Sequence, residues 1–132
     1  MRTRLIVLLM SLGTLLLSGC SSASDPFASN DLCKYYRVTS GDLSGGQSSP
    51  YPITVAAGQT VSLSYVAEME EGSAEFQLLN DLSDPKWMAP VTPTTTTATL
   101  TVDTKLDAGP HNMIIVFSKA KKYRICWKVD VK

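Results

Sequence analysis

Three cysteines and one histidine are the residues of this sequence best suited to nucleophilic, redox or metal chemistry. Cys20, Cys33 and Cys126 lie far apart, and none belongs to a C-x-x-C pair of the redox or zinc type. His111 stands in a Gly-Pro-His-Asn stretch, which predicts an exposed turn leading into a strand. Because no second ligand follows at metal-binding spacing, we expect neither a metal site nor a cofactor.

Ser44 lies in the two stretches that come closest to catalytic motifs. Residues 43–47 spell LSGGQ, which resembles the signature of ABC ATPases, a segment that opens a helix in that family. Two prolines follow at residues 50 and 52 and disfavour a helix, and the chain has no G-x-x-x-x-G-K-[ST] loop. Residues 41–46 are similar to the GDSGG of trypsin-like proteases, with one leucine inserted. We therefore expect no enzyme; a small hydrolase using Ser44 and His111 is the catalytic alternative.

The first residues have the layout of an export signal. Arg2 and Arg4 precede an apolar run that ends in small residues, and the run is short for a membrane-spanning helix. Leu-Ser-Gly-Cys at 17–20 resembles the lipobox of bacterial lipoproteins. The resemblance implies a signal peptide at 1–19, cleavage before Cys20, and acyl chains such as palmitate on Cys20. Ser21, which follows Cys20 in place of an aspartate, resembles the pattern that permits transfer to the outer membrane in a cell with two membranes. In a cell with one membrane, the protein is expected on the outer face of that membrane.

Charge and cysteine count narrow the possible partners. Twelve basic residues balance twelve acidic ones, so no strong field favours nucleic acid. The lysines and arginine near residues 119–124 are offset by glutamates at 68–75, which predicts solvated turns. With Cys20 carrying lipid, Cys33 and Cys126 remain, and in an oxidising compartment they most simply form a disulfide.

After Cys20 the sequence predicts a tether and one β domain. Residues 20–31 are small, polar and interrupted by a proline, so they read as a flexible tether that reaches at most about 40 Å. Residues 32–132 show alternating apolar and polar positions between turn residues and no helix pattern. Residues 40–50 are expected to form a loop. About eight short strands are expected, at 33–39, 51–55, 60–67, 73–80, 86–89, 97–103, 112–118 and 122–131.

This pattern predicts an all-β domain, a single antiparallel β-sandwich of the jelly-roll or immunoglobulin-like kind. The pieces AAGQTVSLSY, GSAEFQLLN and LDAGPHNMIIVF resemble small bacterial jelly-roll or pre-peptidase C-terminal modules. The resemblance implies a fold and no activity. Within 122–131, Cys126 alternates with Ile125 and Trp127, so we expect a disulfide on the outer face that joins the first and last strands.

We expect a non-catalytic lipoprotein of the cell envelope whose domain binds a protein or glycan near the membrane. Trp87 and Tyr51 are the candidate binding residues, since partly exposed aromatic side chains stack on sugars or anchor partners. An assembly subunit of an envelope or secretion complex is the alternative, and an exposed edge strand would favour it. A periplasmic enzyme inhibitor is a further alternative, which a protruding loop at 40–50 would favour. The partner and the oligomeric state are left open.

Overall fold

The computed structural model describes residues 27, 30–35, 37–80, 84–94 and 96–132. Its elements in chain order are α1 (Asp31–Tyr35), β1 (Arg37–Gln47), β2 (Tyr51–Val55), β3 (Val61–Glu68), β4 (Glu71–Leu79), β5 (Pro85–Val91), β6 (Thr96–Thr101) and β7 (Gly109–Val131). The all-β prediction is confirmed. Among the described residues, no helix has the length and apolar character needed to cross a membrane.

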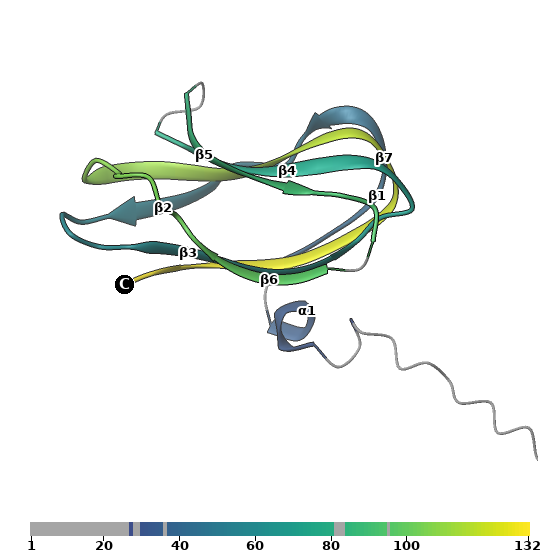
Figure 1. Ribbon diagram of the computed structural model, residues 1–132, viewed down its shortest axis with the longest axis horizontal. Helices are drawn as coiled ribbons and strands as arrows, with labels where there is room; N and C mark the ends of the chain where they lie inside the picture. The colour runs from purple at the N-terminus through teal and green to yellow at the C-terminus, as the bar shows by residue number, and fades with distance from the viewer. Residues whose placement is uncertain (1–26, 28–29, 36, 81–83, 95) are drawn as a thin grey trace, which may run out of the picture.

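All seven strands belong to one antiparallel sheet in the order β5-β4-β7-β3-β6, with β1 and β2 also paired to β7. The 23-residue strand β7 bonds to β4 through its first part and to β3 through its second part. Figure 1 shows β7 running along an upper layer, curving, and returning along a lower one. The upper layer contains β5, β4 and β2, and the lower layer contains β6 and β3.

The bend in β7 corrects the prediction of two separate strands at 112–118 and 122–131. Lys119 and Lys122 have positive φ angles of 51° and 46°, which turn the strand locally while β1 stays paired on both sides of the bend. Gly72 of β4 (φ 86°) lies against this bend, and a Cβ there would overlap the carbonyl group of Lys119. The charged stretch therefore marks a corner within one strand rather than a turn between two.

Alternating apolar side chains fill the space between the layers. Leu63 of β3, Phe76 of β4 and Trp127 of β7 are at most 2% exposed. The ring of Phe76 lies 5.3 Å from that of Tyr65 and 5.6 Å from that of Trp127. Burial of such large side chains is the main stabilising term for a domain of this size.

The start of the domain differs from the prediction in two places. Residues 33–35 lie in α1 rather than in a strand, because the Asn30 side chain accepts a hydrogen bond from the Leu32 N–H (2.9 Å) and Asp31 occupies the first turn. The segment 40–50, expected as a loop, forms β1 as far as Gln47. Its many glycines carry no apolar pattern, and pairing with β7 decides its conformation.

Candidate functional site

The chain enters the domain on the outer face of the lower layer. Phe27 is only 3% exposed and packs against Val66 of β3 and Cys126 of β7, with Leu32 and Cys33 beside them. Val66 and Cys126 are opposite each other in the β3–β7 ladder, and both point away from the main core. We call Phe27, α1, Val66 and Cys126 the attachment face. Figure 1 shows α1 lying beneath the lower layer.

A disulfide fastens the attachment face. Cys33 and Cys126 are bonded, with Cα atoms 4.9 Å apart and a sequence separation of 93. The disulfide predicted from the cysteine count is therefore present in the structure. Cys126 lies on the outer face, as predicted from its alternation with Ile125 and Trp127. The expected partner element was wrong: the bridge joins β7 to α1, not to the first strand, because Cys33 precedes β1.

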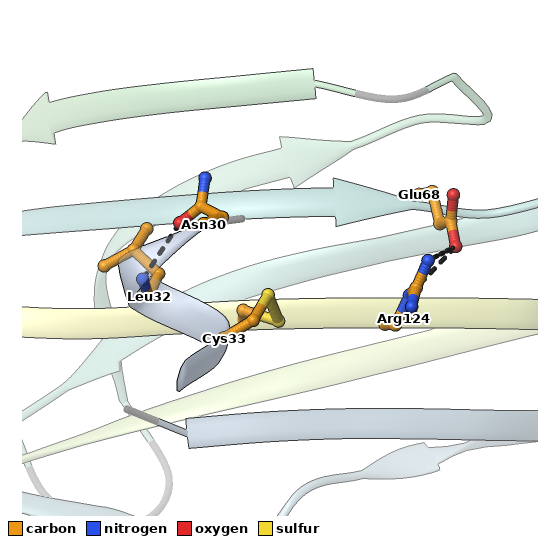
Figure 2. Close-up of a disulfide and its surroundings, with 6 residues drawn as sticks. Asn30, Leu32, Cys33, Glu68 and Arg124 are labelled. Atoms are coloured by element: carbon orange, nitrogen blue, oxygen red, sulfur yellow. Dashed lines mark hydrogen bonds and ion pairs between the residues drawn. A yellow bond between two sulfur atoms is a disulfide. The ribbon is translucent and has the colours of Figure 1, made fainter. Parts of the chain in front are cut away.

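Arg124 adds a second, non-covalent fastening. Its guanidinium carbon lies 3.8 Å from the centre of the Phe27 ring. Its Nε and Nη2 atoms both donate to Glu68 Oε1, at 3.0 and 2.8 Å. Figure 2 shows the Arg124–Glu68 pair and the disulfide along the same face of β7 and β3. The arginine is thereby held over the Phe27 ring, within the distance of a cation–π contact.

Cys20, the predicted signal peptide at 1–19 and residues 21–26 lie outside the described residues. Phe27 is already packed on the sheet, before residue 32 where the domain was expected to begin. Phe27 and the start of α1 at Asp31 therefore lie against the sheet, within the range 20–31 that the sequence predicted as a tether.

The two candidate binding aromatics belong largely to the core. Trp87 and Tyr51 are half-buried and pack against it. The Tyr51 ring meets Trp127 edge-on at 5.6 Å. In the upper layer, Trp87 is opposite Leu78, and Met113 lies between Leu78 and Tyr51. Three strand spacings of about 4.8 Å separate the two aromatics, so they form no common stacking platform.

His111 is not the exposed turn residue that the sequence predicted. It is 1% exposed in β7, opposite Ile53 of β2, because the inward alternation of β7 begins at residue 111. Its Nε2 atom lies 2.8 Å from the Asp107 carbonyl and donates to it, while Nδ1 has no hydrogen-bond partner among the described atoms. Ser44 lies beside the pair of Gly45 and Ser118, about 20 Å along β7 from His111, so the structure does not bring the two together.

The bend of β7 carries the densest group of charges. Lys121 pairs with Glu71 at 2.7 Å and Lys122 with Glu70 at 2.5 Å, beside a shallow groove of about 370 Å³ over Leu43 and Ala120. Hydrogen bonding to these glutamates raises the pKa of both lysines. Burial, followed by the charge of Asp42, raises the pKa of Tyr123. These shifts move the three pKa values further from neutral pH, so they do not create an acid or base catalyst here.

Over the residues placed by the structure, no group of three His, Cys, Asp or Glu side chains is arranged to hold a metal ion. The chain matches no protein-family model, and no curated protein sequence matches it. The attachment face combines the disulfide, the packing of Phe27 and the Arg124–Glu68 pair on one surface.

Proposed function

We propose that this protein is a lipid-anchored lipoprotein of the cell envelope and a non-catalytic binding module held close to the membrane. The lipobox-like Leu-Ser-Gly-Cys at 17–20 supplies the anchor. The observation that carries the proposal is the fastening of Phe27 and α1 to the sheet by packing, disulfide and cation–π contact.

The fastening restricts where the domain works. From Cys20 to Phe27 a fully extended chain spans at most about 25 Å. The attachment face is where that chain reaches the domain, so the outer face of the lower layer is turned toward the bilayer. The partner, a protein or a glycan, is then met at the membrane surface, and acyl chains on Cys20 provide the retention that a single protein contact would not.

An assembly role is the second candidate, and β6 favours it. This strand pairs only with β3 among the described strands, so one of its edges is open. Open edges are sites at which another strand is added. The hydrolase alternative has little support, because His111 is buried away from Ser44. The inhibitor alternative loses its protruding loop, because residues 40–47 are strand.

The anchor is tested with the full-length chain in a bacterium that processes lipoproteins. A clickable fatty acid should label the wild type, and Cys20→Ser should lose the label and leave the membrane fraction. Cys33→Ser with Cys126→Ser is the control for the loss of other cysteines: because it destabilises the domain, its label is measured per amount of full-length chain, and that ratio should be kept. A Cys20→Ser variant that stays membrane-bound would refute the anchor.

Binding is tested by crosslinking the lipidated protein in its native envelope and identifying what it holds. A defined partner that is captured by wild type, and less by a Cys20→Ser variant, supports the binding module. Recovery of the same abundant membrane proteins as any lipoprotein control would refute it.

A further inference from the structure

The edge of β6 that faces away from β3 pairs with no other described strand and presents a regular set of main-chain groups. The Val102 N–H donates to the Val61 carbonyl at 2.8 Å, which fixes the phase of the β3–β6 ladder. Main-chain groups of successive residues point to alternate sides in an antiparallel pair. The N–H and C=O groups of Thr97, Thr99 and Thr101 therefore point away from β3, toward the open edge.

The other edge strands carry features that discourage strand addition, and β6 does not. β5 contains Pro85 and Pro90, and β2 contains Pro52, none of which can donate a hydrogen bond. β1 has a register shift between Gly41 and Leu43. β6, with the sequence TTATLT, has no proline, no charge and no register shift, the combination that natural edge strands avoid unless they pair.

The β6 sequence also complements itself. In an antiparallel pair centred on Thr99, Thr97 lies opposite Thr101 of the second copy, and Ala98 lies opposite Leu100 of the second copy. Threonine pairs are favourable across strands, and within the chain the Thr99 hydroxyl already lies 3.1 Å from that of Ser64 on the neighbouring strand. Ala98 and Leu100 are half-buried on the inner face and would gain cover.

We propose that two copies of this chain associate through antiparallel pairing of their β6 strands, with Thr99 opposite Thr99, to form a continuous sheet across a two-fold axis. A second copy is the occupant because it matches β6 position by position. A strand of another protein would find no charged side chain in β6 to select it.

The dimer fits a membrane-anchored protein, and this step rests on the proposed anchor. A two-fold axis perpendicular to the sheet keeps the outer faces of both lower layers on the same side. The exposed threonines of β6 and the attachment face lie on that one outer face, since Val66 is opposite Thr97. Both chains would then enter from the same side, as two anchors in one bilayer require. A six-residue edge is short, so confinement to a surface is what makes such a weak contact effective.

Cysteine crosslinking in the full-length, membrane-embedded protein tests the register. Two differently tagged copies, one carrying Thr97→Cys and the other Thr101→Cys, should form a disulfide-linked dimer that contains both tags. Thr97→Cys alone should crosslink poorly, because the two Thr97 positions lie about 13 Å apart in this register. Thr54→Cys, at an exposed position of edge strand β2, is the matched control and should not crosslink. Equal crosslinking at Thr97 alone, or at Thr54, would overturn the proposed pairing.

A second variant tests the hydrogen bonds. Thr99→Pro removes an N–H that points to the open edge and leaves the β3 ladder intact, whereas Thr99→Ala keeps that N–H and removes only the hydroxyl. Since a two-fold dimer loses the bond twice, Thr99→Pro should reduce crosslinking of the Thr97–Thr101 pair about tenfold or more, and Thr99→Ala should retain it.

The two proposals fail separately. An acyl-labelled, membrane-bound chain that gives no β6 crosslink overturns the dimer and leaves the anchor standing. A chain that carries no acyl label overturns the anchor. Capture of a different protein by Thr99→Cys, in place of a second copy, would show that the edge serves another partner and would overturn the self-association.

Discussion

The Cys33–Cys126 bridge gives the sharpest stability prediction, because its loop encloses almost the whole domain. With a sequence separation of 93 between the cysteines, the chain-entropy model gives a stabilisation of about 4.6 kcal/mol. We expect Cys33→Ala with Cys126→Ala to lower the free energy of unfolding by about 3–5 kcal/mol, a large fraction of the roughly 5–15 kcal/mol typical of a domain. Urea denaturation of the bridged protein and the double variant measures the difference. A loss below about 1 kcal/mol would refute the reasoning.

The same bridge predicts a local effect. α1 has only five residues, too few to be stable alone, so its position depends on the bridge and on Phe27. In Cys33→Ala, the free Cys126 thiol lies beneath this short cover while the sheet stays folded. Thiol labelling should therefore proceed through local opening, faster than global unfolding. Adding Phe27→Ala should raise the labelling rate further. Labelling that follows the global unfolding rate in both variants would show that α1 holds without the bridge.

Three further predictions concern the bend and the attachment face. Arg124→Ala should cost about 1 kcal/mol in urea unfolding, since it removes both the ring contact and the ion pair, and Arg124→Lys should recover little because lysine cannot lie flat over the ring. Gly72→Ala should lower the free energy of unfolding much more than Gly58→Ala. Both glycines have a positive φ, but only at Gly72 would the added Cβ overlap main-chain atoms. Equal losses of stability in the two variants would contradict the close approach. Because burial raises the pKa of Tyr123, the stability that its neutral form contributes is complete below about pH 10 and is lost as pH rises through the folded-state pKa. Tyr123→Phe should therefore reduce the fall in the free energy of unfolding at alkaline pH. An unchanged slope of that free energy against pH would contradict the prediction.

Strands with clear alternation were predictable from sequence. The expected segment 51–55 coincides with β2, and 60–67 differs from β3 by one residue at each end. In β3, Val61, Leu63 and Tyr65 are buried, as the period of two required. The expected segment 86–89 lies within β5, which bonds only to β4 among the described strands.

The elements that were missed have few apolar side chains or are short. β1 is rich in glycine and serine, so its strand conformation comes from hydrogen bonds to β7 rather than from its own pattern. α1 is a single short helix, and its start signal, Asn30 followed by Asp31, is weak without the sheet beneath it. The burial of Trp87 and Tyr51 could not be read from sequence either, because a single strand does not reveal which of its faces the neighbouring strands cover; both are half-buried against the core.

The sequence by itself determined the strand periodicity, the balanced charge, the lipobox-like stretch Leu-Ser-Gly-Cys at 17–20 and the spacing of the three cysteines. Only the tertiary structure decided that β7 bends at Lys119 and serves both layers, that His111 points inward, and that the bridge fastens α1 to an outer face. The open edge of β6 belongs to this second group. Periodicity is a local property of the chain, whereas bends, faces and edges depend on which strands lie beside one another.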